Sequence, residues 1–161
     1  MVNRYLYTDE IIRETMKKSI NKSVLVLDVI GMLICIYCIY KGVLLDSTFL
    51  IVEGVFLSFF VICINAYKIK KAIDIQIERI RVQYGEEPQE ITIELKDNIK
   101  MYIKDSKKEI SFNDVISYKE TDNLLIILLK GKMTIPLKKD SFVEGSIKEC
   151  KELLDGILNR R

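Results

Sequence analysis

The sequence predicts a pair of membrane-embedded helices joined to an α+β domain. Apolar residues gather in two long runs in the first half of the chain, and the second half changes to the apolar–polar alternation typical of strands. The 161 residues are 49% hydrophobic and 30% charged, which is compatible only with apolar residues concentrated in part of the chain. A net charge of +2 is too balanced for an electrostatic nucleic-acid binder. The sequence has no histidine, so the commonest general base and metal ligand is missing.

Two apolar runs are each long enough to cross a membrane. They cover about residues 23–41 and 48–67, and a helix of such length spans a hydrocarbon core of about 30 Å. The short link between them predicts an antiparallel helical hairpin. Buried core helices are the alternative, but a chain this short has too little else to cover both. The first run lacks a signal-peptide cleavage pattern, so we interpret it as a retained anchor.

The distribution of basic residues predicts the orientation of this hairpin. Lysines and arginines flank it on the sides of both termini, and the link carries only Lys41. The positive-inside rule then places both termini in the cytoplasm and the link outside. We therefore expect a multi-pass protein of the cell membrane.

Two carboxylates lie inside the predicted spans. Asp28 is near the cytoplasmic end of the first span and Glu53 near the outer end of the second, so they cannot act as one pair. Charged groups at such depth are costly and are candidate functional residues. We expect a side-chain hydrogen bond across the hairpin at each. Asn65 is level with Asp28, and the residues near the level of Glu53 are Tyr37, Tyr40 and Lys41. A proton or ion site and a contact with another membrane subunit are the alternatives.

No motif for catalysis or cofactor binding stands out. Cys35 and Cys38 share a helix face, but no further ligand pair completes a metal site, so we interpret them as small apolar residues. The sequence has no Gly-rich phosphate loop or nucleotide fingerprint, and Ser141 has no histidine to activate it. We predict a non-enzymatic protein with no catalytic, cofactor-binding or metal-binding residues and no cofactor.

Helical segments flank the predicted hairpin. Residues 1–22 form a cytoplasmic leader with an amphipathic helix over residues 8–21, which Thr8 caps and which lies on the membrane or packs against the following domain. Residues 68–85 continue the second span at helical spacing up to Gly85. The result is one helix over residues 48–84, roughly 55 Å long.

Residues 86–161 have the pattern of a small cytoplasmic sheet domain. Further predicted strands follow a hairpin of residues 91–95 and 99–103; they lie near residues 110–112, 115–121, 124–129 and 133–137. Leu124–Leu129 is too short to span a membrane and therefore predicts a strand covered on both faces. Ser146 caps a final helix with one apolar stripe. About six antiparallel strands closed by a C-terminal helix are typical of a pleckstrin-homology-like (PH-like) domain.

Over most of its length, the chain resembles the YcxB-like family of small bacterial membrane proteins. The most specific stretches are ISFNDVISYKET at residues 110–121 and IPLKKDSFVEG at residues 135–145. The family often has tryptophan where Phe112 stands. The resemblance implies a two-span anchor in the bacterial inner membrane with a cytoplasmic PH-like domain. It implies no activity, cofactor or catalytic residue.

Surface lysines and strand edges suggest different functions. Two groups of lysines could contact anionic lipid headgroups: Lys104, Lys107 and Lys108, and Lys130, Lys132, Lys138 and Lys139. Exposed strand edges could instead accept a strand from a protein partner. We expect a membrane-anchored binding or regulatory module that contacts the lipid bilayer, an unidentified protein or another copy of itself, and no nucleic acid. A lipid-binding module is the alternative, and a subunit of an oligomeric transport assembly, which would need Asp28 or Glu53, is the third.

Overall fold

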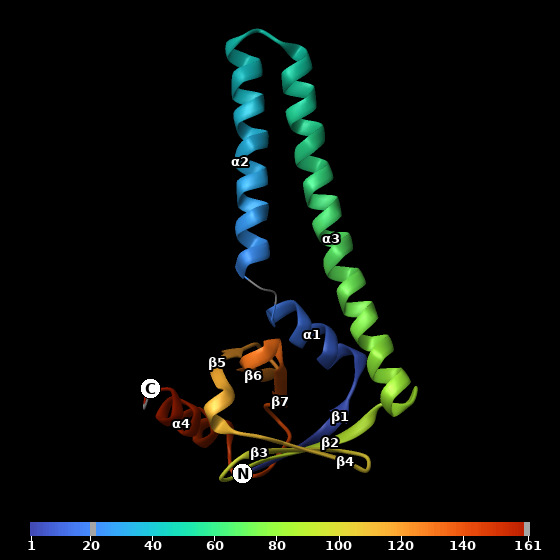
Figure 1. The fold of residues 1–161 in the computed structure, drawn as a ribbon, viewed down its shortest axis with the longest axis vertical. Coiled ribbons are helices and arrows are strands. Elements are labelled where there is room, and N and C mark those ends of the chain that lie inside the picture. The colour runs from blue at the N-terminus through green and yellow to red at the C-terminus, as the bar shows by residue number, and fades with distance from the viewer. Residues whose placement is uncertain (20–21, 160–161) are drawn as a thin grey trace. The chain divides into compact units, whose positions relative to one another are not determined.

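The computed structural model describes residues 1–19 and 22–159, with the side chains of residues 22–28 and 132 outside the description. Four helices and eight strands lie in these residues (Figure 1). In chain order they are β1 (Val2–Tyr7), α1 (Asp9–Ser19), α2 (Lys22–Leu44), α3 (Thr48–Tyr84), β2 (Gln89–Leu95), β3 (Ile99–Ile103), β4 (Ser106–Ile110), β5 (Val115–Glu120), β6 (Leu124–Leu129), β7 (Thr134–Lys138), β8 (Phe142–Glu144) and α4 (Ile147–Leu158). The chain forms two compact units. We call Met1–Ser19 with Gln76–Arg161 the sheet unit, and Ile20–Ile75 the helical unit.

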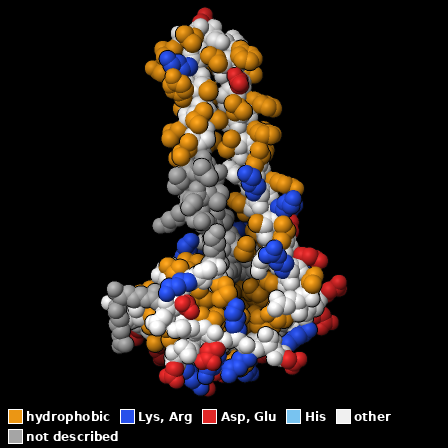
Figure 2. All heavy atoms as spheres, in the orientation of Figure 1, with side chains coloured by type: hydrophobic (Ala, Val, Ile, Leu, Met, Phe, Trp, Pro, Cys, Tyr) orange, Lys and Arg blue, Asp and Glu red, His pale blue; other side chains and the backbone are white. Residues whose placement is uncertain are grey.

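The helical unit consists of α2 and most of α3. The bounds of α3, Thr48–Tyr84, are those that the sequence predicts. Among the described residues, α3 is the one helix long and apolar enough to cross a membrane, and only 6% of its apolar window is buried. Hydrophobic side chains predominate on the described surface of the helices that is visible in Figure 2, with charged side chains among them. The described apolar part of α2, Val29–Leu44, is shorter, so the structure contains one candidate span, and the span predicted at residues 23–41 stays a prediction.

A glycine allows α2 and α3 to approach closely. A Cβ atom added at Gly54 would lie 2.6 Å from Ile39 Cγ1 and 3.1 Å from the carbonyl oxygen of Cys35. The corresponding nearest atom at Gly31 is Val61 Cγ1 at 3.9 Å, an ordinary contact. Small residues permit this kind of backbone approach in pairs of apolar helices. Cys35 is buried beside Gly54, which agrees with its interpretation as a small packing residue.

The sheet unit holds two antiparallel sheets, where the sequence predicts one sheet of about six strands. The strand order is β4-β3-β2-β1-β8 in the first sheet and β5-β6-β7 in the second. The predicted hairpin β2–β3 and the strand β6 are confirmed. Phe112 is a correction: we assigned it to a strand, but it begins a short 3-10 helix at Phe112–Asp114, which Ser111 caps by accepting a bond from the Asn113 N–H.

The first strand, β1, was not expected from the sequence. It lies inside the five-stranded sheet and pairs with β2 from Val2↔Glu94 to Tyr7↔Gln89, with β8 on its other side. The segment we expected to be a separate leader, residues 1–22, therefore contributes both β1 and α1 to the sheet unit. The leader helix itself is confirmed as α1, with Ile11 and Ile12 buried.

Two side chains of β1 connect the two sheets. Asn3 is only 1% exposed; its Nδ2 donates to the Lys138 carbonyl at 2.8 Å, and the Lys138 N–H donates to Asn3 Oδ1 at 3.1 Å. The Tyr5 hydroxyl donates to the Pro136 carbonyl, and burial raises the pKa of Tyr5 well above its usual value. Because Lys138 and Pro136 both belong to β7, these bonds satisfy backbone groups along that strand.

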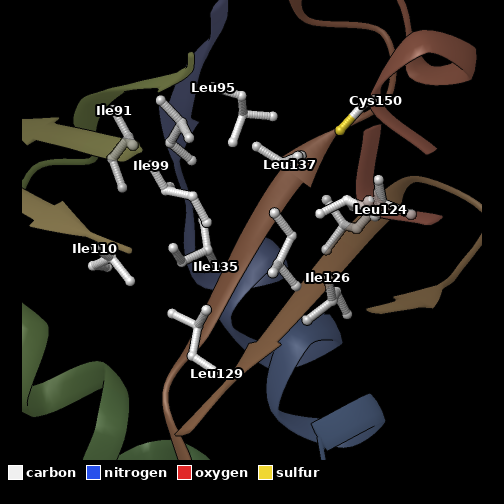
Figure 3. Packing of buried hydrophobic residues seen from close by; sticks show 14 of the residues in the cluster. Ile91, Leu95, Ile99, Ile110, Leu124, Ile126, Leu129, Ile135, Leu137 and Cys150 are labelled. Atoms are coloured by element: carbon white, nitrogen blue, oxygen red, sulfur yellow. The ribbon is translucent and has the colours of Figure 1, made fainter. Parts of the chain in front are cut away.

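Buried side chains from both sheets and α4 form one hydrophobic core (Figure 3). β6 contributes most of its residues to it, so the prediction that both faces of this strand are covered is confirmed. α4 contributes Cys150 and Leu154. Its predicted N-cap is confirmed, because the Ser146 hydroxyl accepts a bond from the Glu149 N–H.

Candidate binding surface

The outward face of the five-stranded sheet carries a polar row that crosses four strands. Successive members stand directly opposite each other on β1, β2, β3 and β4; they are Arg4, Thr92, Tyr102 and Lys107. Neighbours in such a row have Cβ atoms about 4.5–5.5 Å apart. The Lys107 Nζ lies 5.8 Å from the centre of the Tyr102 ring, a cation–π geometry. The row ends at β4 in a positive charge.

A second row on the same face alternates in charge. It consists of Glu94 on β2, Lys100 on β3 and Glu109 on β4. The Glu109 Oε1 also accepts a bond from Asn98 Nδ2 at 3.0 Å. Opposite charges facing each other across strands favour the pairing of those strands. This charged row ends at β4 with the acid Glu109, two residues away from Lys107, the terminal lysine of the polar row.

A polar hollow of about 430 Å³ opens on the same face. Its lining residues are Arg4, Gln89, Glu90, Thr92, Tyr102 and Lys104. The Arg4 Nε lies 3.4 Å from Glu90 Oε1, and the Lys104 Nζ donates to the Tyr84 carbonyl. Both basic groups of the hollow are therefore engaged within the chain.

The edge of the sheet at β4 is the most open part of this surface. Ser106 to Glu109 are all exposed, and no strand lies beyond β4 in the sheet order. Edge strands present unpaired backbone N–H and C=O groups. A two-residue turn joins β3 to β4, so the pair that flanks it, Ile103 and Ser106, is a hydrogen-bonded pair. Because such pairs alternate along an antiparallel ladder, the backbone N–H and C=O groups of Ser106, Lys108 and Ile110 point toward β3. Those of Lys107 and Glu109 then point away from the sheet.

The other strand edges are shorter or engaged. β8 has three residues, and its pairing with β1 shifts register between Val2 and Asn3. β7 is bonded by the side chains of Asn3 and Tyr5. β5 lies beside α4, and the Tyr118 hydroxyl donates to Asp155 Oδ1 at 2.8 Å; this bond raises the pKa of Tyr118. β4 is thus the long accessible edge of the described sheets.

The second predicted lysine group is distributed over separate ion pairs. Lys130 Nζ lies 3.8 Å from Asp114 Oδ1, Lys138 Nζ 3.4 Å from Asp140 Oδ1, and Lys139 Nζ 2.6 Å from Glu120 Oε1. The Lys132 side chain lies outside the described residues. Acidic and basic side chains are interspersed on the visible face of this unit (Figure 2). Such pairing reduces the positive potential that an anionic membrane would attract.

Glu120 joins three parts of the sheet unit. Its two carboxylate oxygens lie 2.6 Å from Lys139 Nζ and 2.6 Å from Lys151 Nζ, so the end of β5 is tied to the chain after β7 and to α4. The hydrogen bond from Lys139, followed by that from Lys151, lowers the pKa of Glu120 from 4.5 to about 2. The charged form is therefore favoured by folding.

The stability of the sheet unit is expected to depend on pH through Glu120. A carboxyl with a lower pKa when folded contributes stability above its unfolded pKa and loses it as the pH falls toward the folded value. The contribution of Glu120 should then disappear between about pH 4.5 and pH 2. The Glu120→Gln variant should show a smaller decrease in urea midpoint over this range than the wild type. The exposed α4 variant Glu152→Gln is the control; an equal change in both variants would contradict the role of Glu120.

The predicted intramembrane residues do not form a site in the described structure. Glu53 is exposed on α3, and within the described part of the chain it makes no hydrogen bond, contrary to our expectation. The Asp28 side chain lies outside the described residues. Cys38 is half-buried and Cys63 exposed, and residues 1–19 and 22–159 contain no group of three His, Cys, Asp or Glu side chains that could hold a metal ion.

Comparison of the chain with protein-family models, with curated proteins and with solved structures gave no match. From the sequence we grouped Lys104, Lys107 and Lys108 as a candidate lipid contact, and the structure places Lys107 and Lys108 on β4. Nothing in the sequence pointed to Arg4 and Tyr102, which β1 and β3 bring beside them. Strand alternation in VNRYLY could have indicated β1, although nothing local specifies its neighbours.

Proposed function

We propose that this protein is a membrane-anchored, non-enzymatic binding module whose β4 edge accepts a strand from a protein partner. The observation that carries the proposal is the exposed edge of β4, with the outward backbone groups of Lys107 and Glu109. Strand addition uses such groups for affinity and the neighbouring side chains for specificity. The polar row and the charged row end at this edge and supply those side chains.

The membrane anchor in this proposal is the pair α2 and α3. The support is the apolar surface of α3, of which only 6% of the membrane-length window is buried, and the apolar run that continues through α2. The basic residues on the terminal sides favour a cytoplasmic sheet unit with the link between the helices outside. We further propose that the sheet unit is PH-like and related to the YcxB-like family. The order of β2 to β7 followed by α4, together with the two quoted motifs, supports this relationship.

Anionic-lipid binding is the second candidate function. The observation that favours it is that Arg4 and Lys104 both line the polar hollow, although Arg4 is paired with Glu90 and Lys104 donates to the Tyr84 carbonyl. The ion pairs of Lys130, Lys138 and Lys139 count against it. Lysine-mediated lipid binding should be lost at high ionic strength, whereas strand addition should persist.

The test is crosslinking in intact cells, followed by gentle purification of the full chain. The Lys107→Pro variant removes an outward N–H, while Lys107→Ala removes the side-chain charge and keeps that N–H. We expect a crosslinked protein species with the wild type and with Lys107→Ala, and at least a severalfold loss with Lys107→Pro. Equal capture by all three chains would contradict strand addition. Recovery of anionic lipid alone, released by salt, would support the lipid-binding candidate instead.

A further inference from the structure

We infer that the strand added to β4 is β4 of a second copy of this chain, so that two five-stranded sheets join edge to edge. The inference rests on the proposed function, because it specifies the occupant of the same edge. It starts from the sequence of β4, SKKEI. When two copies run antiparallel about Lys108, Lys107 of each copy stands opposite Glu109 of the other. β4 is therefore complementary to itself in charge.

The backbone agrees with this register. Lys107 and Glu109 are the residues whose N–H and C=O groups point away from β3. Opposing Lys107 with Glu109 of the second copy makes a hydrogen-bonded pair, in which each residue donates one bond and accepts one. The two-fold axis repeats the pair, so all the outward groups of these two residues are satisfied.

The side chains on the outward face agree as well. The charged row Glu94–Lys100–Glu109 alternates in sign and ends with an acid at the edge. Lys107 of the second copy would continue this alternation beyond Glu109. In the same way, Lys107 of the first copy would gain Glu109 of the second copy as a neighbour. A foreign peptide would need an acid and a base at these same two positions to match as well.

The geometry favours a closed dimer over a growing fibre. A pairing of identical edges about a two-fold axis uses one edge from each copy and leaves none of that kind free. The opposite edge of the sheet is the three-residue β8, which is too short to propagate the assembly. Two copies anchored in one membrane would also meet at a raised effective concentration.

Lys108 limits the strength of the association. It lies on the axis, where the Cα atoms of two opposed residues in a non-hydrogen-bonded pair are about 4.5 Å apart. Like charges opposite each other oppose pairing. The Lys108 Nζ bonds Met133 Sδ at 3.0 Å within its own chain, which draws the charge away from the axis. We therefore expect a reversible dimer.

A cysteine on the axis provides the test, using the full chain in membrane vesicles. In Lys108→Cys the two thiols meet at a separation that a disulfide can bridge, and mild oxidation should give a crosslinked dimer. The matched control is Ser106→Cys, on the same strand and the same side. Its two copies would lie roughly 13 Å apart along the strands, beyond the reach of a disulfide. We expect at least about tenfold more dimer with Lys108→Cys than with Ser106→Cys, after subtracting the wild-type background from the native cysteines.

Charge exchange then tests the register. Added to Lys108→Cys, the single changes Lys107→Glu and Glu109→Lys each place like charges opposite one another and should lower crosslinking severalfold. The double exchange Lys107→Glu with Glu109→Lys restores opposite charges and should restore the dimer. Equal crosslinking by Lys108→Cys and Ser106→Cys, or no recovery in the double exchange, would overturn the inference. Loss of a different captured protein with Lys107→Pro, without crosslinking at residue 108, would also overturn it and leave the proposed function standing.

Discussion

A fragment that begins at residue 86 is expected to remain unfolded in water. It lacks β1, which lies between β2 and β8 in the five-stranded sheet. Without β1 the core loses Tyr5, and the backbone groups of Lys138 and Pro136 lose their partners. Burial of one large side chain contributes about 1.5–3 kcal/mol, each buried group left unpaired costs about 1–3 kcal/mol, and a whole domain is stable by only about 5–15 kcal/mol. Circular dichroism should show no cooperative thermal transition for the fragment.

Restoring the missing strand in trans provides the control. A peptide of residues 1–19, which contains β1 and α1, should restore cooperative unfolding when mixed with the fragment. The same peptide carrying Asn3→Ala and Tyr5→Ala should not. Cooperative unfolding of residues 86–161 alone, with strong hydrogen-exchange protection in β2 and β3, would show that β1 is dispensable.

The Asn3→Ala variant of the full chain is expected to lose about 2–4 kcal/mol of stability in the sheet unit, because it leaves two backbone groups of Lys138 without partners. Asn3 is 1% exposed, and its amide makes both a donor and an acceptor bond to that residue. Hydrogen exchange in mild detergent, read at amides of β7 over a urea series, would measure the loss.

Asn123→Ala is the matched control for Asn3→Ala. Asn123 is exposed, and its Nδ2 makes a long bond of 3.4 Å to Glu14 Oε2. Exposed substitutions of this kind usually change stability by less than about 0.5 kcal/mol. Similar protection in the two variants would mean that the Asn3 amide does not stabilise the junction between the sheets.

The sequence predicted correctly those helices and strands whose signal is a periodic pattern or a capping side chain within a few neighbouring residues. The helical spacing that runs unbroken from Thr48 to Tyr84 predicted α3 with its observed bounds. The apolar run Leu124–Leu129 predicted β6, and Ser146 predicted the start of α4. In each case the signal is a periodicity or a capping side chain within a few residues, and tertiary contacts reinforce it.

The elements that sequence reasoning missed depend on distant partners. β1 was missed because its neighbour β2 lies far along the chain; the Met1 amino group bonds the Leu95 carbonyl, 94 residues away. β8 has only three residues, too few for a periodic pattern. The junction between the two sheets also involves such contacts, those of Asn3 and Tyr5 with β7.

The candidate site was predicted in part for the same reason. Lys107 was recognised in a group of lysines, but its position at an open edge, opposite Tyr102, requires the strand order. The pairing of Lys139 with Glu120 likewise joins segments that are separate in sequence. Charge composition alone could not distinguish paired lysines from those at the edge.

The position of β1 has a consequence for the order of events during synthesis. β1 is translated before α2 and α3, whereas its partner β2 follows both of these helices and β8 follows later still. Residues 2–7 must therefore wait, unpaired, while α2 and α3 are translated and leave the ribosome. Pairings between such distant segments are slow to form, because a long loop must close before any contact compensates for its lost entropy. The residues of α2 and α3 are thus synthesised before the five-stranded sheet can close around β1.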